Sequence, residues 1–192
     1  LLAARVPPPR SVPVATRRVR SVAVSVAGLG GPGGVGGLAE LALAVGLRLT
    51  PRLSLAPAVS AAVTPVAMAG PTGSIRVGWG AGQMLLGYAP GRLGARVSPR
   101  LGVGGGLAVV WAQGRASSPL QGGTDVTPVG MVSGAAGLAI RVRARLRLVV
   151  GAGVSVLLPA VAVRVSGEEV ARLGPLVIRG VLGLEWGPRG GE

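Results

Sequence analysis

The sequence contains no cysteine, no histidine, no lysine, no asparagine and no phenylalanine. Without cysteine and histidine the chain has no disulfide, no thiolate nucleophile and none of the usual zinc sites. Charged residues make up only 14% of the 192 residues, and one tyrosine and six acids remain for acid–base chemistry. Ser117, Ser118 and Asp125 share one predicted loop, but no base accompanies them. We therefore expect neither an enzyme nor a cofactor.

All 20 basic residues are arginine, and the formal net charge is +14. Arginine, glycine, alanine and proline have GC-rich codons, whereas the absent lysine, asparagine and phenylalanine have AT-rich ones, so we attribute much of this excess to genome composition. The arginines among residues 1–20 resemble those that bind anionic headgroups or nucleic acid. This region has no aromatic residue to stack on bases. We interpret residues 1–20 as an extended basic, proline-rich leader and expect no nucleic-acid partner.

Hydrophobic residues make up 49% of the chain and the mean hydropathy is +0.60, which is too apolar for an ordinary soluble surface. No segment is clearly a transmembrane helix. The best candidate, residues 148–163, is shorter than the about 20 residues that a helical span needs, and it contains Gly151, Gly153 and Pro159. A short helical membrane protein spanning at this segment is one alternative reading of the sequence.

Residues 38–64 contain two runs in which large and small residues alternate on either side of Thr50-Pro51-Arg52. Successive side chains of a strand point to opposite faces, so each run has one bulky apolar face and one small or polar face. Two such runs joined by a tight turn predict a β-hairpin. The predicted bulky face carries Leu41, Leu43, Val45, Leu47, Leu49, Leu53, Leu55, Val59 and Val63.

The same alternation predicts eight strands in all. Besides the hairpin they lie at residues 21–28, 75–88, 96–112, 129–142, 146–158 and 176–186. The connections alternate long and short, with long loops at 30–37, 69–74, 113–128 and 167–174. In the strand at 75–88 we place Ile75, Val77 and Trp79 outward and then Met84, Leu86 and Tyr88 outward, which requires a β-bulge near Gly82-Gln83.

This layout resembles the small eight-stranded outer-membrane β-barrels of Gram-negative bacteria, over residues 21–186 and with residues 187–192 as a tail. The predicted fold is all-β, an eight-stranded antiparallel up-and-down transmembrane barrel. The resemblance implies an outer-membrane protein with a structural or loop-mediated binding role. It also implies that the lipid bilayer and the outer-membrane assembly machinery are partners; the sequence identifies no soluble partner. Barrels of this type commonly end on an aromatic residue that assists assembly, and Trp186 is similar.

The alternation also predicts which charged side chains point inward. Side chains nearly fill the interior of an eight-stranded barrel, so these charges should pair with one another and plug the lumen, with Glu185 and Arg147 as the preferred pair. Two alternatives remain: some of these residues lie at the rim in water, or the arginine excess supports a minor anion leak. The predicted lumen charges are Glu40, Arg48, Arg76, Arg141, Arg147, Arg179 and Glu185.

The few aromatic residues fall near the ends of the predicted strands. Trp79 and Trp111 lie toward the long-loop end, and Tyr88 and Trp186 lie at the short-turn end. Aromatic side chains are enriched at both membrane–water interfaces, so we predict that all four are interfacial.

A different class of function is suggested by Gly28-Leu29-Gly30-Gly31-Pro32-Gly33, which satisfies G-x-G-x-x-G after an apolar strand. A dinucleotide-binding fold would place a helix next and an acid about 20 residues further on. The sequence has Thr50, Pro51 and Arg52 there. A dinucleotide-binding α/β protein using residues 28–33 is therefore the alternative to the barrel.

Overall fold

The computed structural model describes residues 19–31, 37–70, 73–90, 95–116, 123–165 and 168–187. Eleven β-strands account for most of them. Eight are long: β1 (Val19–Gly30), β2 (Leu38–Arg48), β3 (Leu53–Ala62), β5 (Gly73–Tyr88), β6 (Val97–Ala116), β7 (Thr124–Arg141), β8 (Leu146–Leu158) and β11 (Leu176–Trp186). Three are short: β4 (Val66–Gly70), β9 (Val161–Val165) and β10 (Glu168–Leu173).

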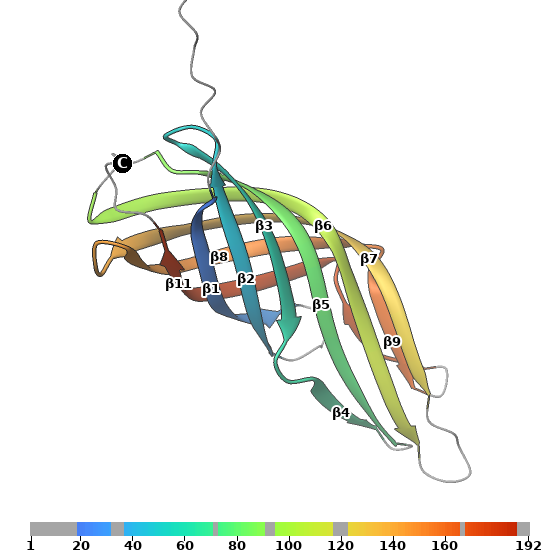
Figure 1. Cartoon of the computed structure of the whole chain (residues 1–192). Helices are drawn as coiled ribbons and strands as arrows, with labels where there is room; N and C mark the ends of the chain where they lie inside the picture. The colour runs from blue at the N-terminus through green and yellow to red at the C-terminus, as the bar shows by residue number, and fades with distance from the viewer. Residues whose placement is uncertain are drawn as a thin grey trace, which may run out of the picture.

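The eight long strands close into one antiparallel barrel. They follow one another in the order β3-β2-β1-β11-β8-β7-β6-β5, and β3 also pairs with β5, which joins the two edges. Closure gives each of these strands two neighbours, as a β-protein in hydrocarbon requires. The predicted eight-stranded barrel is confirmed (Figure 1).

The outer face carries the bulky side chains that the alternation predicted. On β6, for example, Leu101, Val103 and Leu107 are more than half exposed, while Ala108 is fully buried. The same pattern holds on β1, β2, β7, β8 and β11, where alternate Val, Leu and Ile residues face outward. An apolar outer band is what a barrel surrounded by lipid presents.

One strand departs from the predicted parity. In β5, Ile75, Val77 and Trp79 are buried inside the barrel, not exposed on its outer face. The bulge predicted near Gly82-Gln83 is absent, because β5 pairs with both neighbours in unbroken register through these residues. The prediction was wrong because it assigned Ile75, Val77 and Trp79 to the lipid side on account of their size, and this part of the interior is itself filled with bulky residues.

The connections are shorter than predicted at the loop end. β4 and β5 occupy most of the segment predicted as a loop at 69–74, and β6 and β7 extend to Ala116 and from Thr124. Most of the predicted loop at 167–174 is strand β10, which pairs with β9 in a two-stranded sheet separate from the barrel sheet. Parts of the predicted loops, and the leader up to residue 18 and the tail from residue 188, lie outside the described residues.

The alternative helical span is also wrong. Residues 146–158 form β8, which is paired along its length with β7 and β11. Within the described parts of the chain, no helix is long and apolar enough to cross a membrane.

The interior of the loop-end half contains a packed apolar core. Trp79, Val77 and Leu157 are at most 1% exposed, and they belong to one cluster of buried side chains from the barrel wall. Val161 and Leu173 from the β9–β10 hairpin join the same cluster. The hairpin therefore packs its apolar side chains against the core at the mouth of the barrel.

Candidate functional site

The charged interior residues of the turn-end half include a close ion pair that the sequence reasoning missed. Glu185 of β11 is 7% exposed, and its Oε2 lies 2.6 Å from Nη2 of Arg100 on β6. Neither Glu185 Oε2 nor Arg100 Nε has an aligned hydrogen-bond partner, so the contact is an ion pair without hydrogen-bond geometry. Arg147 stands opposite Glu185 in register, but no ion pair joins the two. The predicted Glu185–Arg147 pair is therefore wrong, although the inward parity of Arg100 was available from its alternation with Leu101.

Two further arginines bind backbone at the turn end. Arg48 donates from Nε to the Thr50 carbonyl at 3.3 Å and from Nη2 to the Pro51 carbonyl at 2.7 Å. Arg141 Nη2 donates to the Ala95 carbonyl at 3.4 Å. Both side chains therefore bind turns at the rim of the barrel. This agrees with the alternative interpretation that some of the predicted lumen charges lie at the rim.

A second polar group lies closer to the loop end of the lumen. Arg179 of β11 donates from Nη2 to Ser155 Oγ of β8 and lies 3.8 Å from the sulfur of Met131. Ser133, which is paired in register with Ser155, donates from Oγ to Gln83 Oε1 at 3.0 Å. These contacts link four strands through the interior, since Gln83 lies on β5 and Ser133 on β7.

Glu40 of β2 is the most deeply buried acid of the described residues. It is 1% exposed, and neither carboxylate oxygen has a hydrogen-bond partner there. An ionised carboxylate without a partner is costly to bury. The structure places Glu40 in the interior as its parity predicted, but does not join it to an arginine.

Arg76 does not belong to the lumen. It alternates on β5 with the buried Ile75 and Val77, and its side chain is exposed on the outer face. The correction follows directly from the parity of β5, because the bulge that would have turned Arg76 inward is absent.

The aromatic residues divide between the two faces. Trp79 lies inside, so the prediction that it is interfacial is wrong. Trp111 lies on the outer face, where its ring covers Gly78 of the neighbouring strand and leaves no room for a Cβ. Tyr88 and Trp186 are exposed on the outer face near the turn end. The interfacial role of these three remains a prediction.

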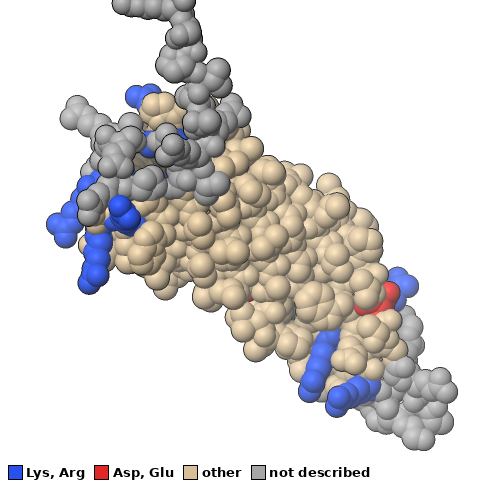
Figure 2. Space-filling model, in the orientation of Figure 1, with Lys and Arg blue, Asp and Glu red and all other residues tan. Residues whose placement is uncertain are grey.

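Charge on the surface agrees with an apolar belt. Figure 2 shows arginines gathered at the two ends of the molecule, with an uncharged band between them on the face drawn. No group of three or more potential metal-ligating residues occurs in the described part of the chain.

The described part of the glycine motif, residues 28–31, is extended strand and the residue after it, not a loop that leads into a helix. Gly28, Leu29 and Gly30 lie within β1 and pair with β11, and Gly28 and Leu29 also pair with β2. The segment expected to form a helix after the motif is strand β2. The dinucleotide-binding alternative is therefore not supported.

No protein-family model matches the sequence, and no curated protein matches it. Solved structures do match. The chain is similar to a major outer membrane protein from Thermus thermophilus, with a TM-score of 0.61 and 16% identity over 88% of this chain and 99% of that one. Neisserial surface protein A (NspA) gives a TM-score of 0.56 and 14% identity over 87% and 94%.

A third similar structure is the outer membrane protein OprG from Pseudomonas aeruginosa, with a TM-score of 0.52 and 13% identity over 89% of this chain and 97% of that one. At sequence identities this low, the similarity is evidence of a shared fold alone. The neighbours are bacterial outer-membrane proteins, in agreement with the localisation expected from the sequence. The chain thus has the fold of the small eight-stranded outer-membrane β-barrels.

Proposed function

We propose that this protein is an integral outer-membrane barrel that is non-catalytic and non-conducting and that acts through its loop end. The observation that supports this proposal is the apolar cluster in the loop-end half of the interior, which includes Val161 and Leu173 of the β9–β10 hairpin. Water and ions cross an apolar constriction poorly because it favours dewetting.

The length of three strands supports a role outside the membrane. A tilted strand crosses a bilayer with about 9–11 residues, whereas β5, β6 and β7 contain 16, 20 and 18 residues. In Figure 1, β5, β6 and β7 reach beyond the rest of the barrel at the loop end. We propose that this projecting sheet and the hairpin beside it form a binding surface for a soluble partner.

Single-channel recording in planar bilayers tests the closed interior. We expect no steady current steps from the wild-type barrel, and measurable steps from a Trp79→Ala/Leu157→Ala double variant, because these two side chains are essentially fully buried in the cluster. Trp111→Ala is the matched control, since it removes an indole from the outer face. Steady wild-type steps as large as those of the double variant would contradict the proposal. A β-type circular dichroism spectrum and heat-modifiable gel migration establish beforehand that each variant is a folded barrel.

A further inference from the structure

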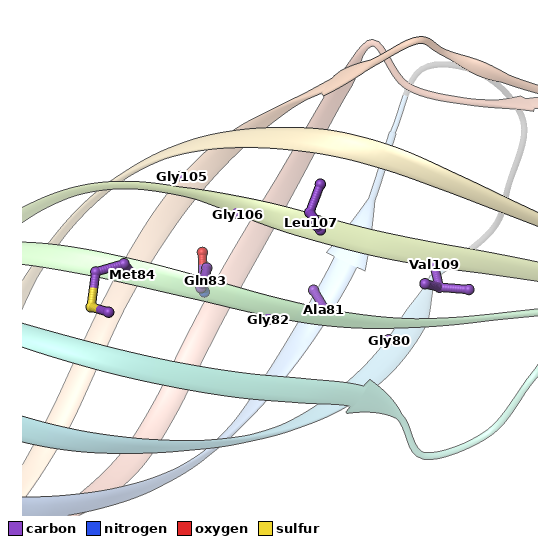
Figure 3. A pocket seen from close by; sticks show the side chains of 9 residues that line it. All are labelled: Gly80, Ala81, Gly82, Gln83, Met84, Gly105, Gly106, Leu107 and Val109. Atoms are coloured by element: carbon purple, nitrogen blue, oxygen red, sulfur yellow. The ribbon is translucent and has the colours of Figure 1, made fainter.

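The outer surface of β5 and β6 has a depression. Four outward positions on these strands are glycines. Trp111 covers Gly78, whereas Gly80, Gly82 and Gly105 lie opposite Val109, Leu107 and Met84. The depression has a volume of about 710 Å³, and the side chains of Met84, Leu107 and Val109 border it (Figure 3). Open space surrounds the position of a Cβ on Gly82. In a bilayer, hydrocarbon must fill this glycine notch.

Two arginines lie beside the glycine notch at the loop end. Arg76 pairs in register with Gln113, and Arg115 pairs with Ser74, so the two arginines are diagonal neighbours on one face. Diagonal neighbours across an antiparallel pair are about 7–8 Å apart, within reach of long side chains. Both are exposed, and neither has an ion-pair or hydrogen-bond partner within the described residues.

Trp111 connects the arginine pair with the notch. It shares the outer parity of Arg115 on β6, and its ring lies over Gly78, the position on β5 between Arg76 and Gly80. Indole rings prefer the level of the lipid headgroups. The order along the surface is therefore two cations, an interfacial aromatic ring and an apolar notch, which is the order of groups in an anionic lipid.

We propose that this surface binds a phosphate-bearing lipid, with the phosphate between Arg76 and Arg115 and an acyl chain in the glycine notch. Arginine binds phosphate through two parallel N–H donors, and such charge-assisted bonds are stronger than neutral ones. A second copy of this chain is a poorer occupant, because a two-fold interface on this face would bring the same arginines against one another. The proposal rests on the proposed function, since a lipid site requires a membrane-embedded barrel.

Native mass spectrometry from a non-ionic detergent tests the proposal with three probes: dimyristoyl phosphatidic acid, dimyristoylglycerol and inorganic phosphate. We expect the wild type to retain dimyristoyl phosphatidic acid ~10-fold better than dimyristoylglycerol, which has the same acyl chains but no phosphate. A tenfold difference corresponds to about one charge-assisted hydrogen bond. Inorganic phosphate should bind no better to the wild type than to an Arg76→Gln/Arg115→Gln variant, because the acyl chain is part of the ligand.

Two variants and two controls separate the headgroup from the notch. Arg76→Gln/Arg115→Gln should remove the preference for phosphate, and Gly82→Leu should weaken binding of both lipids. Arg143→Gln/Arg145→Gln removes two exposed arginines from the turn end, and Gly180→Leu fills an outward position on β11 that also has open space. Both controls should bind phosphatidic acid like the wild type.

Several results would overturn the lipid site. These are equal retention of the two lipids, equal losses in the controls, or a dimer that Gly82→Leu dissociates in the absence of lipid. Circular dichroism and heat-modifiable migration of each variant distinguish these results from failure of the proposed function. A folded β-barrel without lipid preference refutes only the lipid site, whereas a helical or unfolded wild type refutes the barrel as well.

Discussion

The two halves of the barrel interior are filled in different ways, although the outer surface is apolar along both. The loop-end half contains large apolar side chains, including Trp79 and Leu157, in one buried cluster, and Glu40 and Arg179 are the charged residues described there. The turn-end half contains the Arg100–Glu185 ion pair, and Arg48 and Arg141 bind backbone at its rim. An eight-stranded barrel must fill its interior with side chains. The comparison shows that apolar packing and long charged side chains serve this purpose in the same barrel.

The largest loss of stability is expected from Trp79→Ala, which removes a large side chain from the apolar cluster of the loop-end half. Truncating a buried Trp creates a cavity, and such changes cost roughly 3–5 kcal/mol of unfolding free energy. The measurement is the temperature at which the heat-modifiable band converts in detergent. Trp111→Ala is the control on the outer face, where the ring is only partly buried. Equal shifts for the two variants would contradict the assignment of Trp79 to the core.

Arg100→Gln should remove the ion pair of the turn-end half and lower the free energy of unfolding by a smaller amount. It leaves Glu185 without its ionic partner, and removing one member of a buried pair costs about 3–5 kcal/mol when the pair is fully buried. Because the Arg100 side chain is 33% exposed, we expect a smaller loss, about 1–2 kcal/mol. Arg147→Gln is the matched control, and we expect it to change the melting temperature less. The reverse order would restore the predicted Glu185–Arg147 pair.

Glu40→Gln, unlike the two preceding variants, should not destabilise the barrel. This carboxylate is buried without a hydrogen-bond partner among the described residues, so its neutral isostere should be tolerated or should stabilise the barrel, by about 1 kcal/mol. The same thermal assay in detergent checks this. A clear loss of stability would mean that Glu40 has an ionic partner in solution.

The smallest effect is expected from Glu169→Gln, in the hairpin outside the barrel wall. Arg172 donates hydrogen bonds to Glu169 at 2.8 and 3.2 Å, and these bonds lower the pKa of Glu169 below its usual value of 4.5. A lowered folded-state pKa stabilises above the unfolded value, and this stabilisation is lost as the pH falls through the lowered value. Both side chains are exposed, so melting curves of Glu169→Gln and the wild type should coincide at neutral pH. A distinct shift at pH 7 that disappears at pH 3 would show that the pair anchors the hairpin.

Much of the barrel was predictable from residue alternation. The eight long strands, the outward Val22, Val24 and Val26 of β1 and the outward Leu182 and Leu184 of β11 all follow from a period of two. The inward position of Glu185 was predictable in the same way. Its partner was not, because ion pairing in a lumen depends on which long side chains reach across it, and Arg100 lies on a strand that is not adjacent to β11.

The alternation of β5 specified an extended segment with two distinct faces, and this held. It did not specify which face is inside, because both faces of its loop-end half offer a plausible environment: bulky Ile75, Val77 and Trp79 on one, and glycines with Arg76 on the other. Only closure of the barrel decided this, since unbroken pairing with β3 and β6 gives β5 one parity from end to end. Period-two patterns record that neighbours point in opposite directions, whereas inside and outside exist only once the sheet has closed.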